Sequence, residues 1–84
     1  MLDNVSLEAG LNELIRELLK GRSVDRIVLA DDDLRHVGLT SLDMVSLVLL
    51  VEAKFNLRIP EGKITPGNFR SIRTMSALIG ELLQ

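Results

Sequence analysis

The sequence contains no cysteine and a single histidine, His36. Without cysteine, the chain can form no disulfide, no thiolate metal site and no cysteine nucleophile. One histidine cannot provide the cluster of imidazoles that zinc sites commonly use. The sequence therefore predicts no metal site and no thiol chemistry of its own.

Aromatic residues are almost as scarce, with two phenylalanines and neither tryptophan nor tyrosine. Hydrophobic residues still make up 46% of the 84 residues, so the core must consist of Leu, Ile and Val. A chain this short forms one domain, which we place over residues 1–84, and it buries a modest fraction of its surface. A catalytic cleft would remove much of what stabilises it, so we expect a protein that is not an enzyme.

No apolar run reaches the length of a membrane span, and the acidic start Met1-Leu2-Asp3 is unlike a secretory signal. We therefore expect a cytoplasmic protein that does not insert into membranes. Met1 and the full pattern of a first helix favour a free-standing protein over an excised module. We also expect a monomer.

The net charge of −2 is unevenly distributed along the chain. Residues 1–53 hold ten acids and five bases, whereas residues 54–84 hold two acids and five bases. An acidic surface around the centre of the chain should repel nucleic acid and favour basic protein partners. Arg70 and Arg73 are too sparse a basic pair, without aromatic neighbours, for nucleic-acid recognition.

Amphipathic periodicity predicts three main helices: from about Asp3 or Ser6 to Lys20, from about Ser41 to Asn56, and from about Thr74 to Leu83. The apolar stripe of the first is Leu7, Leu11, Leu14, Ile15, Leu18 and Leu19, and that of the last is Met75, Leu78, Ile79, Leu82 and Leu83.

Smaller signals complete the expected fold. Gly21 is suited to end the first helix, whereas Gly10 inside it costs roughly 1 kcal/mol relative to alanine. Phe69 and Ile72 lie three residues apart, which predicts one short helical turn that buries both. The expected class is all-α: a small four-helix bundle of three main helices and one short helix.

Residues 22–39 form a long connection between the first two main helices. We expect an irregular loop that places Ile27 and Leu29 in the core and is anchored again by Leu34 and Val37. Asp31-Asp32-Asp33 lacks the alternating ligands of a calcium loop, which favours a solvated acidic segment. A loop of this length is uncommon unless it is functional.

The helix expected from Ser41 to Asn56 is apolar on two sides. Met44, Leu47, Val48, Val51 and Phe55 cluster within about a third of the helical wheel and form the core stripe. Leu42, Val45 and Leu49 form a second stripe, roughly opposite. A small bundle has no core for two opposed stripes, so the second stripe predicts a binding surface.

Thr40-Ser41-Leu42-Asp43 opens this helix and fits a capping box, with Thr40 as N-cap and Asp43 as the acidic partner three residues later. Capping alone is the commoner role of such a pattern. Ser41 then occupies the first helical position, where its hydroxyl can point outward. An anion attached there would lie at a helix N-terminus, which is a favourable place for it.

Gly38-Leu39-Thr40-Ser41-Leu42-Asp43, followed by Val45, Leu47, Val48 and Glu52-Ala53-Lys54-Phe55, resembles the signature of acyl carrier proteins. Ile59-Pro60 after the helix fits the same pattern. The resemblance is densest from Leu34 to Ile72 and extends over nearly the whole chain.

The resemblance implies that Ser41 carries 4′-phosphopantetheine, which a phosphopantetheinyl transferase takes from coenzyme A. The thiol of the arm would hold acyl groups, and aminoacyl groups in some members, as thioesters. Partner enzymes, including an acyl- or aminoacyl-loading ligase and downstream acyl-processing enzymes, would contact Thr40, Leu42, Asp43, Val45, Leu49 and Glu52. The interior near Leu47 and Ile72 would shelter an acyl chain.

Thr40 stands where the family usually has aspartate, and Ser46 where it often has glutamate. Residues 64–72 are similar to segments in carriers of aminoacyl and other specialised groups. These features favour a specialised carrier over the general carrier of fatty-acid and lipid biosynthesis.

Two alternatives to the carrier use some of the same residues. A hydrolytic triad of Ser41, His36 and an aspartate would need all three groups in register with an oxyanion hole, which nothing in the sequence indicates. An unmodified helical interaction module would use the same second stripe to hold a partner. Only the carrier requires the hydroxyl of Ser41.

Overall fold

The computed structural model describes residues 4–20 and 27–83. Its elements are α1 (Asn4–Leu19), α2 (Leu34–Val37), α3 (Ser41–Phe55), the 3₁₀ helix η1 (Glu61–Lys63) and α4 (Ile72–Leu82). These ranges contain no strand. The expected all-α bundle of three main helices and one short helix is confirmed.

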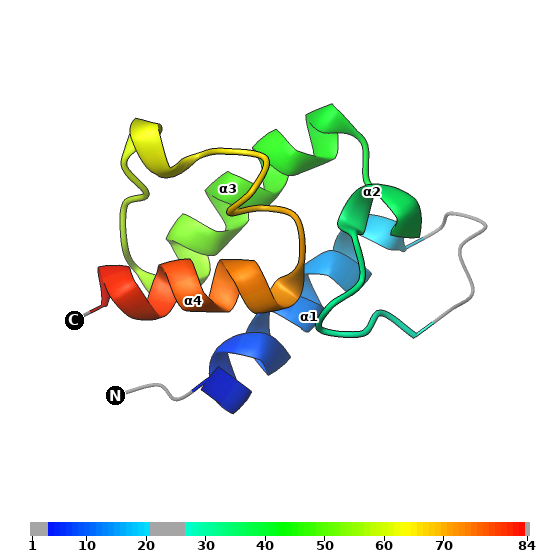
Figure 1. Ribbon diagram of the computed structural model, residues 1–84, viewed down its shortest axis with the longest axis horizontal. Coiled ribbons are helices and arrows are strands. Elements are labelled where there is room, and N and C mark those ends of the chain that lie inside the picture. Colours follow the sequence, from blue (N-terminus) through cyan, green and yellow to red (C-terminus); the bar gives the residue numbers. More distant parts are fainter. Residues whose placement is uncertain (1–3, 21–26, 84) are drawn as a thin grey trace.

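The three long helices pack around one aliphatic core. Helix α1 contacts both α4 and α3, while α2 lies at the end of the bundle next to the start of α3 (Figure 1). Leu7, Leu11 and Ile15 of α1 are fully buried, as their spacing predicted. Met75 and Ile79 of α4 and Leu47 of α3 meet them in the same cluster.

The short helix lies elsewhere than expected. The segment of Phe69 forms a turn, and Ile72 already belongs to α4, which begins after Ser71. The short helix is α2, where Asp33 accepts a hydrogen bond from the N–H of Arg35. Leu34 and Val37 were expected to anchor an irregular loop, and both are buried. The helix itself was missed because four residues are too few for a periodic pattern.

The prediction that Ile27 and Leu29 are buried is wrong. Their side chains are 82% and 61% exposed, and Val28 between them is buried. Side chains alternate along an extended segment, so only one of the two sets can face the core. The side-chain amide of Asn12 donates to the carbonyl of Val28, which fixes this register.

Helix α4 begins two residues before the expected start. Ser71 is its N-cap, and the hydroxyl of Thr74 accepts a hydrogen bond from the N–H of Ser71. The C-terminal position of Gly21, proposed as the end of the first helix, and the capping role of Asp3 lie outside the described residues. None of the described helices is long and apolar enough to cross a bilayer.

Candidate functional site

Ser41 is the first residue of α3, held in place by its neighbours. The Oγ1 of Thr40 accepts a hydrogen bond from the N–H of Asp43 at 3.2 Å, and a carboxylate oxygen of Asp43 accepts one from the N–H of Thr40 at 2.8 Å. The predicted capping box is confirmed. Ser41 is exposed, and its hydroxyl makes no hydrogen bond with any residue that the structure describes.

The turn before Ser41 is fixed by Gly38 and Leu39. Gly38 has φ 127°, a conformation that favours glycine, and the N–H groups of both residues donate to the carbonyl of Leu34. Leu39 is buried and ties the turn to the core. The serine is therefore presented at the surface directly after a turn that these hydrogen bonds and the buried Leu39 anchor.

The second stripe of α3 is exposed, as predicted. Leu42, Val45 and Leu49 are 76%, 58% and 63% exposed, whereas Leu47 and Val51 on the same helix are buried. Met44 and Phe55 of the core stripe are partly buried. The stripe runs away from Ser41 along one side of α3 and forms a largely exposed apolar surface.

The acidic residues proposed for docking have structural partners. Asp43 is buried in the capping box, and the carboxylate of Glu52 accepts a hydrogen bond from the N–H of Ile59 at 2.8 Å. Thr40 is exposed beside Ser41. Contact of these three residues with a partner stays a prediction.

A cavity of about 420 Å³ opens beside Ser41. Its apolar wall comes from α3 and from the segment between η1 and α4, and its lining residues are Arg35, Ser41, Met44, Val45, Val48, Leu49, Ile64, Thr65, Pro66, Phe69 and Arg70. Leu47 does not line it, and neither does Ile72; both are buried in the core. The cavity at Ser41 is therefore not lined by Leu47 and Ile72, the residues near which the resemblance implied shelter for an acyl chain.

The two arginines and the loop residues of this cavity were not predicted from the sequence. Arg35 comes from α2 and Arg70 from the turn before α4, so tertiary structure alone brings them to Ser41. The nearest signal in the sequence was the apolar Phe69, which was expected to be buried and is.

The remaining polar candidates lie apart or take part in other contacts. His36 is exposed on α2, and Asp43 is held by Thr40. No group of three His, Asp or Glu residues in the described ranges is arranged to hold a metal ion. Each aspartate of Asp31-Asp32-Asp33 contacts another part of the protein. Asp31 binds Arg73, Asp32 accepts a hydrogen bond from the N–H of Leu29, and Asp33 caps α2.

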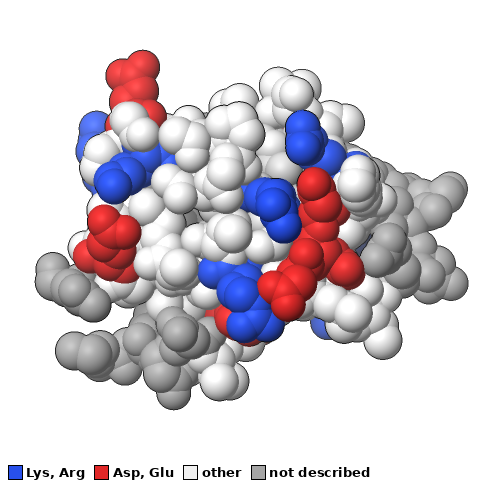
Figure 2. All heavy atoms as spheres, in the orientation of Figure 1, with Lys and Arg blue, Asp and Glu red and all other residues white. Residues whose placement is uncertain are grey.

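Acidic and basic side chains are interspersed on the face of the molecule seen in Figure 2, with wide uncharged areas between them. Ion pairs join elements distant in sequence, such as Lys54 with Glu13 and Lys63 with Glu81. Bases of the C-terminal part thus neutralise acids of the helices they contact.

Comparison with known proteins gives a consistent result. The family described as "Phosphopantetheine attachment site" matches residues 9–79. Aminoacyl carrier protein 1 of Bradyrhizobium diazoefficiens is 37% identical over 81 residues, which is 96% of this chain and 90% of the relative. Aminoacyl carrier protein 2 of the same organism is 35% identical over 75 residues, covering 89% and 84%.

Two crystal structures of Bradyrhizobium japonicum glycine:[carrier protein] ligase contain similar chains. The glycylated carrier protein matches with a TM-score of 0.68 and 39% identity, over 81% of this chain and 96% of that one. The cognate carrier protein, in a complex with an analogue of glycyl adenylate, matches with a TM-score of 0.71 and 35% identity, over 93% and 95%.

The fold and the exposed serine at the start of α3 define a carrier domain. The chain belongs to the phosphopantetheine-attachment family, and it is a specialised carrier protein that holds acyl or aminoacyl groups as thioesters. Proteins of this family carry a covalently attached 4′-phosphopantetheine arm.

Proposed function

We propose that Ser41 is the attachment point of the phosphopantetheine arm. Its hydroxyl is exposed and has no hydrogen-bond partner in the described chain, while Thr40 and Asp43 fix the backbone on either side. The arm supplies a thiol, which the chain itself lacks, and that thiol forms the thioester with the cargo.

The attachment step balances without any group beyond coenzyme A and a phosphopantetheinyl transferase. The hydroxyl oxygen of Ser41 forms a bond with the phosphorus that bears the pantetheine, and adenosine 3′,5′-bisphosphate leaves. The hydroxyl proton passes to a base of the transferase or to water. The N-terminal end of α3 then faces the new phosphodiester, a favourable position for an anion.

The exposed stripe of α3 supports a role in docking. We assign Leu42, Val45 and Leu49 to the surface that partner enzymes contact, because exposed apolar patches on small proteins commonly mark binding sites. Thr40, Asp43 and Glu52 border the same surface. The two ligase complexes of similar chains make an adenylate-forming aminoacyl ligase the favoured loading partner, followed by enzymes that take the cargo onward.

On this account the chain has no catalytic activity of its own and works in the cytoplasm as a monomer. The arrangement of Ser41 and Asp43 supports this, because the carboxylate of Asp43, two residues after the serine, is held in the capping box. The competing function is an unmodified interaction module that uses the exposed stripe alone.

Whole-protein mass spectrometry distinguishes the carrier from the interaction module. The chain is incubated with coenzyme A and a broad-specificity transferase, beside Ser41→Ala and the matched control Ser46→Ala. We expect one phosphopantetheine increment on the parent and on Ser46→Ala, and none on Ser41→Ala. An increment on Ser41→Ala would reject Ser41 as the attachment point.

A loading assay tests the docking surface. The modified chain is given ATP, glycine and an aminoacyl ligase, and thioester formation is followed. Leu49→Ala should slow loading while leaving the fold intact, and Leu29→Ala, an exposed leucine remote from the stripe in sequence, serves as control. Equal slowing by both substitutions would contradict the assignment of the stripe.

A further inference from the structure

Two exposed arginines lie on the same face of the molecule as the serine. Arg35 of α2 and Arg70 of the turn before α4 line the same cavity as Ser41, and both are exposed to solvent. The carbonyl of Arg70 accepts a hydrogen bond from the N–H of Leu34 at 2.8 Å, so the two arginines lie on segments that are bonded to each other. Any protein that approaches Ser41 therefore meets two guanidinium groups.

The acidic groups near this face are engaged within the protein. Helix α3 contains two acids: Asp43 is buried in the capping box, and Glu52 accepts a hydrogen bond from a backbone N–H. Asp33 caps α2 and lies 3.6 Å from Arg35, but its side chain is 21% exposed, whereas that of Arg35 is 70% exposed. Arg70 makes no ion pair with the residues that the structure describes. The charge presented beside the serine is positive, the opposite of what the distribution of charge along the sequence favoured.

The arginines adjoin the exposed apolar stripe of α3. Val45 and Leu49 belong to the stripe and line the cavity together with both arginines. An enzyme that acts on the cargo must reach the arm, so it must approach this face. Protein interfaces commonly combine an apolar centre with a polar rim, where complementary charges decide which partner binds and how fast. Positive charges at this rim call for carboxylates on the partner.

We propose that the aminoacyl ligase that loads this chain contacts it through an acidic surface, with carboxylates of the ligase opposite Arg35 and Arg70. This inference rests on the proposed function, in which the arm is attached to Ser41. The stripe provides apolar contact area, and the two arginines favour an acidic partner and repel a basic one. Guanidinium groups suit this role because they bind carboxylates through paired, charge-assisted hydrogen bonds.

Competition by a chain that cannot carry the arm tests this surface separately from the arm. Mass spectrometry first establishes that the parent is modified. The modified parent is then loaded with glycine and ATP by the glycine:[carrier protein] ligase of Bradyrhizobium japonicum, the enzyme of the two similar complexes. Ser41→Ala is added as an inhibitor that binds through its protein surface alone, and its inhibition constant is measured with and without a second substitution, Arg35→Glu or Arg70→Glu.

The expected result is a weaker inhibitor after either charge reversal. The inhibition constant should rise roughly fivefold or more in each case, because repulsion replaces attraction. Added salt should also weaken inhibition by Ser41→Ala, since it screens charges at an exposed rim. In the modified chains, Arg35→Glu and Arg70→Glu should raise the KM for loading and leave kcat nearly unchanged.

The control is Arg58→Glu in the Ser41→Ala chain. It makes the same change in net charge at an exposed arginine beyond the C-terminal end of α3, the end opposite to Ser41, and should leave the inhibition constant nearly unchanged.

Three results would overturn the proposal while the attachment at Ser41 stands. Tighter inhibition after the reversals at Arg35 and Arg70 would show that the partner surface is basic. An unchanged inhibition constant, or no inhibition by Ser41→Ala at all, would show that the arginines do not meet the ligase. A modified parent that is not loaded would reject a glycine ligase of this kind as the partner. Failure to attach the arm would reject the proposed function itself, and this inference with it.

Discussion

At the junction of α2 and α3, the side chains of Thr40, Ser41 and Asp43 have different roles. Thr40 and Asp43 satisfy each other's backbone N–H groups, and Ser41 between them keeps its hydroxyl exposed. A capping box depends on residues three apart in sequence, so it could be predicted without a structure. The threonine that replaces the usual aspartate keeps the cap intact, and the local geometry of the serine does not need the aspartate.

Removing the cap at Thr40 should destabilise the domain. We expect Thr40→Ala to lower the free energy of unfolding by about 1 kcal/mol, because the N–H of Asp43 loses its acceptor. Thr40→Asp provides another cap acceptor and should stay within about 0.5 kcal/mol of the parent. Urea unfolding measures both. A Thr40→Ala variant as stable as the parent would show that the cap contributes nothing.

Acid should weaken the start of α2 through Asp33. The hydrogen bond from the N–H of Arg35 is the main cause that lowers the pKa of Asp33 below its ordinary value of 3.8; the charge of Arg35 adds to it, and burial opposes it. Since the folded pKa is depressed, its stabilising effect is complete above the unfolded pKa and disappears as pH falls through the folded one.

The carboxyl carbon shift of Asp33, followed by nuclear magnetic resonance from neutral to acidic pH, measures this directly. Its midpoint should lie below 3.8, and the amide signal of Arg35 should move with it. In Asp33→Asn the amide of Arg35 should lose that titration. A midpoint at or above 3.8 would contradict the role of the cap.

At the scale of the helices, α1 and α3 approach closely at Gly10. A Cβ atom at this position would lie 3.0 Å from side-chain atoms of both Lys54 and Phe55. The sequence showed only a glycine that weakens the first helix. The structure supplies the reason for its place, because the surface of α3 occupies the space that a side chain would need.

Two glycine substitutions should therefore have opposite effects. Gly10→Leu overpacks the contact of α1 with α3 and should destabilise by about 1–3 kcal/mol. Gly80→Ala in α4 meets only Leu7, at an ordinary 3.8 Å, and should stabilise by up to about 1 kcal/mol through helix propensity. Thermal unfolding of both variants measures the difference; a stabilised Gly10→Leu would disprove the close packing.

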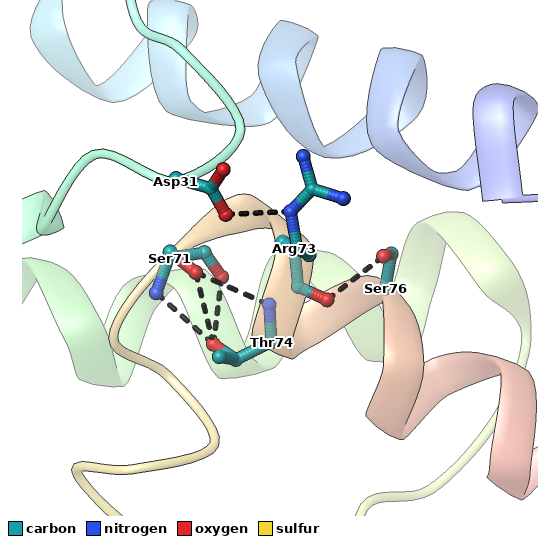
Figure 3. A network of polar contacts seen from close by, with 5 residues as sticks. All are labelled: Asp31, Ser71, Arg73, Thr74 and Ser76. Carbon is teal, nitrogen blue, oxygen red and sulfur yellow. Dashed lines mark hydrogen bonds and ion pairs between the residues drawn. The ribbon is translucent and has the colours of Figure 1, made fainter.

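Across the whole molecule, the connection before α2 is fastened to the start of α4. Arg73 binds Asp31 with its side chain (Figure 3). The backbone N–H of Arg73 also donates to the carbonyl of Ala30. The N–H of Leu34 donates to the carbonyl of Arg70. The hydrogen bond with Asp31 raises the pKa of Arg73. These contacts hold α2, and with it Arg35, beside the serine.

Loss of the Arg73 side chain should loosen this connection without unfolding the domain. Both partners of the Asp31 pair are largely exposed and screened by solvent, so Arg73→Gln should change the free energy of unfolding little. Amide hydrogen exchange at Leu34 should nevertheless become faster, and Arg58→Gln should leave it unchanged. Unaltered exchange in Arg73→Gln would show that the ion pair does not restrain the loop.

The helices and their buried faces followed from the sequence because hydrophobic periodicity and capping are local signals. The sequence did not predict which of Ile27, Val28 and Leu29 is buried, because three consecutive apolar residues do not reveal which one faces the core. The cavity was also missed. Arg35, Ile64 and Arg70 meet Ser41 only after α2 and the segment before α4 have packed against α3.

The most direct test of the carrier on Ser41 is to locate the modification within the chain. The protein is modified with coenzyme A and a transferase, digested, and its peptides are fragmented in a mass spectrometer. We expect the whole phosphopantetheine increment on Ser41, with none on the adjacent Thr40 or on Ser46. An increment on another hydroxyl, or none with several transferases, would contradict the account.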